Sequence, residues 1–101
     1  MQITYEYNGG GLTVYLSGEL DHHTAKKTRD AIDDIISMKD VKKLTIDMSG
    51  VVFMDSSGIG LVLGRYKLLC ELGATLELRV KNAQIRRIFE MSGVNRLIRI
   101  R

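Results

Sequence analysis

The sequence predicts an α/β fold with a mixed β-sheet that begins with an N-terminal hairpin. Two short segments of alternating polar and apolar residues open the chain, on either side of the run Asn8-Gly9-Gly10-Gly11. Helical periodicity and strand-like apolar runs then alternate to the end of the 101 residues. Strands and helices in this order form right-handed crossovers, so the later strands are expected to be parallel.

The first elements follow from local patterns. Residues 2–7 and 12–17 are predicted as strands joined by a tight turn, because glycine permits the positive φ that such turns need. Apolar positions recur every three or four residues from 25 to 36, which predicts an amphipathic helix. Its charged residues are expected to face water: Lys26, Lys27, Arg29, Asp30, Asp33 and Asp34. The next strand is predicted over 44–48, and the apolar run 51–54 follows it.

A second helix is predicted after Ser57, with Gly73 just past its end. Its inward stripe is expected to hold Ile59, Val62, Leu63, Tyr66, Leu69 and Cys70. That phase makes Cys70 a buried thiol and turns a second strip away from the core: Gly60, Leu61, Gly64 and Leu68. Each interior glycine costs about 0.5–1 kcal/mol relative to alanine, so something should need the backbone to come close there. Tight packing on a strand and docking of a partner both remain open.

The last elements are a strand over 75–80, a helix capped by Asn82 and ended by Gly93, and a short strand over 97–100. Ile85, Ile88 and Phe89 are expected to face inward from that helix.

Length and composition suit one domain spanning residues 1–101, since 45% of the residues are apolar and no proline or polar linker marks a boundary. The longest apolar run, 51–54, is far too short for a membrane span, and the start lacks the features of a signal peptide. A cytoplasmic protein is therefore expected. The single cysteine excludes an internal disulfide, and two adjacent histidines without further ligands give no expectation of a metal site or a cofactor.

Charge is unevenly distributed along the chain. Residues 1–50 hold six Lys and Arg against eight Asp and Glu, whereas residues 51–101 hold nine against four. A basic half is compatible with nucleic acid, but its arginines are spread over several elements without interleaved aromatics. A solvated basic surface is the favoured interpretation, so no direct nucleic-acid partner is expected.

The segment Asp55-Ser56-Ser57-Gly58 places serines where the apolar strand ends and the second helix begins. A helix N-terminus has unpaired backbone N–H groups and a positive dipole end. Ser56 or Ser57 could therefore cap the helix or carry a phosphate there.

Four blocks of the chain resemble the anti-sigma-factor antagonists, the single-domain members of the STAS family. They are TIDMSGVVFMDSSGIGLVLGR at 45–65, GELDHHTA at 18–25, Arg65-Tyr66-Lys67 and Phe89-Glu90-Met91-Ser92-Gly93. The GELDHHTA block is similar to the sporulation branch. The resemblance implies helices mainly on one face of the sheet. Relatives of this type usually continue into a C-terminal helix beyond the last strand. Either that helix is expected to be shorter or absent here, or the chain is a truncated or divergent member.

The resemblance also implies a function in partner switching during transcription regulation. The unmodified protein would bind an anti-sigma factor that is also a serine kinase and release a sigma factor. The kinase would use ATP to phosphorylate Ser56, and a metal-dependent serine phosphatase would reverse the modification. Asp21 would lie in the kinase-binding surface, cap the first helix, or do both. The expected partner-binding residues are Asp21, Asp55, Ser57, Gly58, Gly60, Leu61 and Gly64.

Electrostatics explains how one phosphate at Ser56 would act. It adds roughly −1.5 to −2 charges, which the helix N-terminus of the free protein tolerates. In a dry interface, beside Asp55, the same group must lose its water. The switch is therefore expected to act on the interface with little change of fold.

The sequence supports other functions less well. A serine hydrolase with Ser56 as nucleophile and His22 or His23 as base lacks the G-x-S-x-G elbow, so the chain is not expected to be an enzyme. No phosphate-binding glycine loop of the Walker type is present. A general-stress antagonist or a scaffold domain of the same family remains an alternative, although Asp21-His22-His23 favours the sporulation type.

Overall fold

The computed structural model describes all residues, 1–101, and contains one five-stranded mixed sheet with strand order β1-β2-β3-β4-β5. The elements are β1 Gln2–Asn8, β2 Gly11–Leu20, α1 Ala25–Ser37, β3 Lys43–Met54, α2 Ser56–Glu71, β4 Thr75–Arg79, α3 Ala83–Ser92, a 3-10 turn Val94–Arg96, and β5 Arg99–Ile100. β1 pairs with β2 antiparallel, and β2 to β5 pair in parallel. The predicted fold class is confirmed.

The hairpin between β1 and β2 turns through Gly9 and Gly10, whose φ angles are 57° and 89°. Two consecutive positive φ angles give the twist that a two-residue hairpin needs, and they are strained for other residues. The predicted opening hairpin is therefore confirmed.

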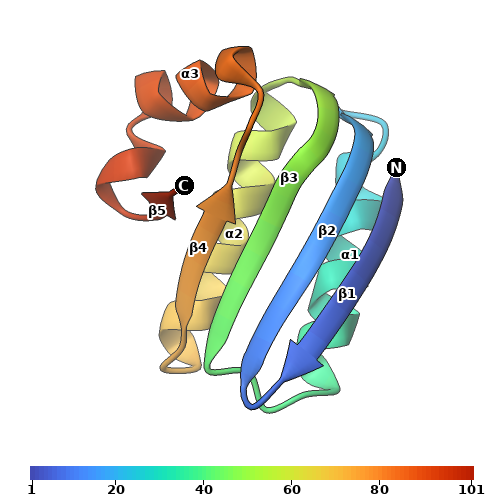
Figure 1. Ribbon diagram of the computed structural model, residues 1–101, viewed down its shortest axis with the longest axis vertical. Helices are drawn as coiled ribbons and strands as arrows, with labels where there is room; N and C mark the ends of the chain where they lie inside the picture. Colours follow the sequence, from blue (N-terminus) through green and yellow to red (C-terminus); the bar gives the residue numbers. More distant parts are fainter.

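Helices α1 and α2 both lie behind the sheet in Figure 1, and α3 lies at its upper end beyond β4. α1 connects β2 to β3 and α2 connects β3 to β4, so two crossovers in the same direction place both helices on one face. The front face of the sheet carries no helix. The expectation that helices cover mainly one face is confirmed.

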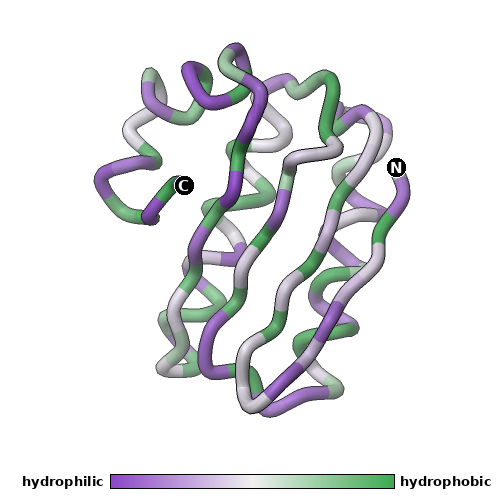
Figure 2. Tube along the Cα trace, viewed as in Figure 1, coloured by the Kyte–Doolittle hydropathy of each residue, from purple (hydrophilic) through white to green (hydrophobic).

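Alternation along the strands builds the core between the sheet and these helices, as the hydropathy of the chain trace shows (Figure 2). Val14, Ile46 and Leu78 are register partners across β2, β3 and β4, and each is fully buried. From α1, Ile32, Ile35 and Ile36 pack against this surface as the periodicity predicts.

The predicted inward stripe of α2 is confirmed at Val62 and Leu69 and is wrong at Leu63 and Cys70. Its buried residues are Gly58, Leu61, Val62, Arg65 and Leu69. Leu63 is 37% exposed and Cys70 is exposed rather than a buried thiol. Apolar side chains occur on nearly every side of this helix, so periodicity alone does not select one face, and an arginine was not expected inside.

Several boundaries also differ from the predictions. β3 is one strand of 12 residues rather than a strand and a separate apolar run. β5 has two residues, and Leu97 lies outside it with 56% of its surface exposed. The predicted Asn82 cap is confirmed, as are the ends at Gly73 and Gly93, whose φ angles are 71° and 83°. No helix is both long enough and apolar enough to cross a membrane.

Candidate functional site

The start of α2 is fixed by Asp55, which occupies the N-cap position in an extended conformation. Its Oδ1 accepts a hydrogen bond from the backbone N–H of Ser57 at 2.8 Å. Of the two roles left open for Ser56 and Ser57, the capping role therefore belongs to Asp55 instead. Ser56 is instead the first helical residue, and its side chain is exposed to solvent. A short acidic cap thus places a serine hydroxyl at the positive end of a helix dipole.

The other carboxylate oxygen of Asp55 reaches the loop that leads into α1. Its Oδ2 accepts a hydrogen bond from the backbone N–H of His22 at 3.1 Å. The N–H of Ser57, and to a smaller extent that of His22, lowers the pKa of the Asp55 carboxyl, because both bonds favour the ionised form. One carboxylate therefore connects two loops that are 33 residues apart in the sequence.

Asp21 organises the loop on the α1 side. Its Oδ1 accepts hydrogen bonds from the backbone N–H groups of His23 at 2.9 Å and Thr24 at 3.1 Å. Its carbonyl accepts a bond from the N–H of Ala25 at 2.9 Å, the first residue of α1. Asp21 therefore stabilises the turn that precedes α1. The N-cap of the helix itself is Thr24, so the prediction that Asp21 is the N-cap of the first helix is wrong. Asp55 thus connects the loop that contains half-buried Asp21 to the start of α2, where exposed Ser56 lies.

A hollow of about 410 Å³ separates the beginnings of α1 and α2. Its lining includes His22, Lys26 and Arg29 from the α1 side, and Ser57 and Gly60 from α2. A side chain built at Gly60 would meet no atom within 4 Å. The surface over Gly60 is therefore open.

Two of the expected partner-binding residues are buried, although one of them, Leu61, also lines the hollow. Gly58 is buried, and a Cβ atom there would lie 2.4 Å from Cγ and Sδ of Met54. Leu61 is 5% exposed and belongs to the core. Gly58 thus lets the helix approach the end of β3. Tight packing on a strand, one of the two explanations left open for Gly60 and Gly64, is wrong, because a Cβ at either glycine would meet no atom within 4 Å. Gly64 is half-buried, and a Cβ there would be free of contacts.

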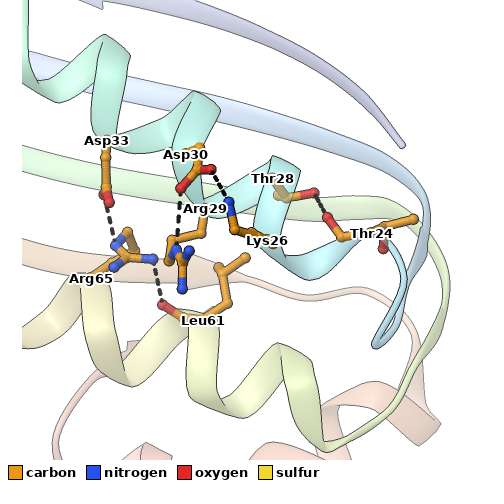
Figure 3. Close-up of polar contacts among 8 residues, drawn as sticks. All are labelled: Thr24, Lys26, Thr28, Arg29, Asp30, Asp33, Leu61 and Arg65. Atoms are coloured by element: carbon orange, nitrogen blue, oxygen red, sulfur yellow. Dashed lines mark hydrogen bonds and ion pairs between the residues drawn. The ribbon is translucent and has the colours of Figure 1, made fainter.

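A buried ion pair holds α1 against α2 one turn below the hollow (Figure 3). Nε of Arg65 lies 2.9 Å from Oδ1 of Asp33, and Nη1 donates to the carbonyl of Leu61 at 3.4 Å. The Arg65 side chain is 9% exposed, and this burial lowers the pKa of its guanidinium while Asp33 opposes the shift. The expectation that Asp33 simply faces water is therefore wrong. No local pattern in the sequence indicates this ion pair, because the partner of Asp33 lies on another helix.

The histidines do not form a catalytic pair with the serine. The rings of His22 and His23 meet edge to face, with centroids 5.6 Å apart. Neither imidazole shares a hydrogen bond with the hydroxyl of Ser56, which a Ser–His nucleophile requires. No group of three or more potential ligand side chains is arranged to hold a metal ion.

The fold and this site define a small α/β domain that displays a serine at an exposed helix start. The STAS domain model matches residues 2–101, so the chain belongs to the STAS family. An anti-sigma F factor antagonist of Paenibacillus polymyxa is 38% identical over 100 residues, covering 99% of this chain and 86% of the relative. An anti-sigma-B factor antagonist of Listeria monocytogenes is 31% identical, covering 89% and 78% of the two chains.

Solved structures agree with this assignment. The anti-sigma factor antagonist SpoIIAA in its unphosphorylated form is 30% identical with a TM-score of 0.83, covering 99% of this chain and 88% of that one. The phosphorylated form of the Bacillus protein SpoIIAA is also 30% identical, with a TM-score of 0.74 and coverage of 99% and 91%. The protein therefore has homologues that are anti-sigma-factor antagonists and a fold shared with both states of one of them.

Proposed function

We propose that this protein is an anti-sigma-factor antagonist controlled by phosphorylation of Ser56. In its unphosphorylated form it binds an anti-sigma factor that is also a serine kinase, and a sigma factor is released. The names of the relatives support the antagonist activity, and the two forms of SpoIIAA support control by phosphorylation. The proposal implies a cytoplasmic regulator without catalytic activity of its own.

The observation that carries the proposal is the position of Ser56. It is exposed, it is the first residue of α2, and its neighbour Asp55 holds the backbone in place without using the serine hydroxyl. A kinase needs an accessible hydroxyl in a fixed position, because positioning supplies much of the catalysis in phosphoryl transfer. Ser57 is a weaker candidate, since it is half-buried and its backbone N–H is bound to the cap.

The proposed partner surface combines both loops at this end of the sheet. Its residues are Asp21, Asp55, Ser56, Ser57, Gly60 and Gly64. The carboxylate of Asp21 could pair with a basic partner residue through Oδ2 while Oδ1 remains bound to the turn. The two glycines allow close approach of another backbone along α2.

Phosphorylation would end binding through charge. The Oγ of Ser56 attacks the γ-phosphorus of ATP, the bond to the bridging oxygen breaks and ADP leaves. The new phosphate then lies beside ionised Asp55 and must be desolvated in the interface. A penalty of about 4 kcal/mol would weaken the complex roughly a thousandfold. A serine phosphatase would restore the binding form.

The main alternative is an antagonist of the general-stress type, which the anti-sigma-B antagonist of Listeria supports. The acceptor serine and the electrostatic mechanism would be the same, and only the partner would differ. Binding assays with kinases of both classes separate the two functions.

Incubation with the candidate kinase and ATP, followed by peptide mapping, tests the proposal. We expect the label on Ser56 and its loss in Ser56→Ala, which should still bind the kinase. Ser56→Asp should bind at least tenfold more weakly, because it places charge at the same position. Ser57→Ala is the matched control and should still be labelled. A label on Ser57, or unchanged affinity of Ser56→Asp, would refute the assigned site or the mechanism.

A further inference from the structure

The helix-free face of the sheet concentrates much of the charge of the basic C-terminal half. Tyr15, Asp47 and Arg79 are register partners across β2, β3 and β4, and their side chains share this face. Together with Ser49, Lys81 and Arg101 they line an open hollow of about 760 Å³. Helices α1 and α2, which carry the Ser56 surface, lie on the other face of the sheet (Figure 1). Val14 is buried on that face, so its neighbour Tyr15 and the hollow belong to the helix-free face.

Cations exceed carboxylates over the β3–β5 half of this face. Glu77 on β4 is 4% exposed and forms ion pairs with three cations. These are Lys43 at 2.7 Å, Arg99 at 4.0 Å and Arg101. Lys43, and less strongly the two arginines, lowers the pKa of Glu77. This carboxylate is therefore ionised and is the shared counter-charge of all three cations.

The remaining cations at the hollow are less well neutralised. Nη1 of Arg79 lies 3.8 Å from Oδ2 of Asp47, beyond hydrogen-bond distance. Lys81 is exposed and has no carboxylate within 4.0 Å. Counting these groups, five cations face two carboxylates, Glu77 and Asp47. The other carboxylate, Glu6, lies on β1 and accepts from the hydroxyl of Tyr15 at 3.4 Å.

We propose that this hollow binds an acidic segment of a protein partner. The guanidinium groups of Arg79 and Arg101 suit carboxylates, which they can bind through paired N–H donors, and Lys81 adds a third positive charge at the rim. Ser17, Ser49 and Tyr15 supply hydroxyl groups for the polar backbone of such a segment. Complementary charge of this kind directs the encounter and the choice of partner.

The same observations disfavour nucleic acid as the occupant. Asp47 lines the hollow, and a peptide backbone can donate an N–H group to its carboxylate, whereas a phosphate backbone has no such donor. Tyr15 is the single aromatic side chain in the lining, so successive bases have no stacking surface. Because this site lies away from the start of α2, its occupancy should not depend on phosphorylation of Ser56.

Titration of the full chain with a hexaglutamate peptide, followed by backbone amide chemical shifts, tests the proposal. We expect the largest shifts at residues 15–17, 47–50 and 79–81, and weaker binding as salt rises from about 50 to 200 mM. Hexaglutamine should cause no shifts. Equal shifts at remote cations such as Lys27 and Arg87 would overturn the proposal, as would tighter binding of a single-stranded oligothymidine of equal charge.

A pair of matched double variants sharpens the test. Arg79→Gln with Lys81→Gln should weaken hexaglutamate binding about five- to tenfold, since two charge pairs are lost. Lys27→Gln with Arg87→Gln removes the same charge from exposed positions elsewhere and should change affinity less than twofold. Equal weakening in both would show a non-specific field effect and refute the site. Concentration-dependent dimerisation that buries residues 79–81, seen by sedimentation, would instead assign the face to a second copy.

Discussion

An aspartate stabilises each of the loops that lead into α1 and α2, but the two loops present different surfaces. Asp21 and Asp55 each follow a parallel strand, and each accepts a hydrogen bond from the N–H two residues further on. After Asp55 the helix begins at once with an exposed serine. After Asp21 a turn containing two histidines precedes the helix, and Lys26 and Arg29 follow. The same type of bond, from a backbone N–H to an aspartate, therefore stabilises both loops, but only Asp55 is an N-cap, and the residues that follow it include the exposed serine.

The largest effect is expected from breaking the ion pair that holds the two helices together. Asp33→Ala removes the nearest counter-charge of the buried Arg65 guanidinium and leaves only the weaker influence of Asp30, which should lower the free energy of unfolding by about 2–3 kcal/mol. Urea denaturation measures the change. Asp30→Ala removes an exposed partner of Lys26 and is the control, with no measurable change expected. If both variants lost a similar amount of unfolding free energy, the Asp33–Arg65 pair would stabilise the protein no more than an exposed ion pair does.

Two glycines of α2 should respond in opposite directions. Gly58→Ala adds a methyl group against Met54 and should destabilise the protein by about 1–3 kcal/mol. Gly60→Ala meets no atom and should stabilise the helix by about 0.5–1 kcal/mol. Thermal unfolding measures both. If Gly60→Ala binds the kinase as tightly as the parent protein, close backbone approach at this glycine is not needed.

Removing the two aspartates compares the entrances directly. Asp55→Ala loses bonds to Ser57 and His22, so it should lower the Tm by roughly 5 °C and loosen both loops. Asp21→Ala should have a similar or smaller effect that is confined to residues 22–25. Amide hydrogen exchange locates the change. If the N–H of His22 exchanged faster in Asp21→Ala but not in Asp55→Ala, the linking role of Asp55 would be contradicted.

The smallest effect concerns acid stability. The hydrogen bonds to Asp55 lower its pKa in the folded state, so its contribution is complete above the unfolded value of about 3.9 and is lost as pH falls through the folded pKa. When the pH is lowered below about 4, the free energy of unfolding of Asp55→Asn should therefore fall by less than that of the parent protein. Asp34→Asn is the exposed control. Parallel stability curves for the parent and Asp55→Asn would refute this contribution.

Local rules predicted the elements and the position of the site. The hairpin, the Asn82 cap and the end at Gly93 depend on neighbouring residues alone, and the structure confirms them. The Asp-Ser-Ser-Gly segment was located in the same way. Which of its residues is the cap depends on backbone geometry, and Asp55 takes that role in preference to the serines.

Tertiary contacts decided what the sequence could not. The rotation of α2 is set by the sheet and by α1, because its own apolar residues surround the helix axis. Leu61 and Arg65 are drawn inward while Cys70 turns outward. The Asp33–Arg65 pair joins residues 32 positions apart, and neither residue is distinguished locally from the charged residues that do face water.

The sharing of one Asp55 carboxylate between Ser57 and His22 has a consequence for recognition. A macromolecule that binds the serine-bearing end of α2 contacts a discontinuous epitope, which is formed by two segments distant in the sequence. A linear peptide copied from residues 50–65 would lack the other half of that epitope and the scaffold that orients it. Such a peptide should be a poor mimic of the intact domain, however faithfully it reproduces the local sequence.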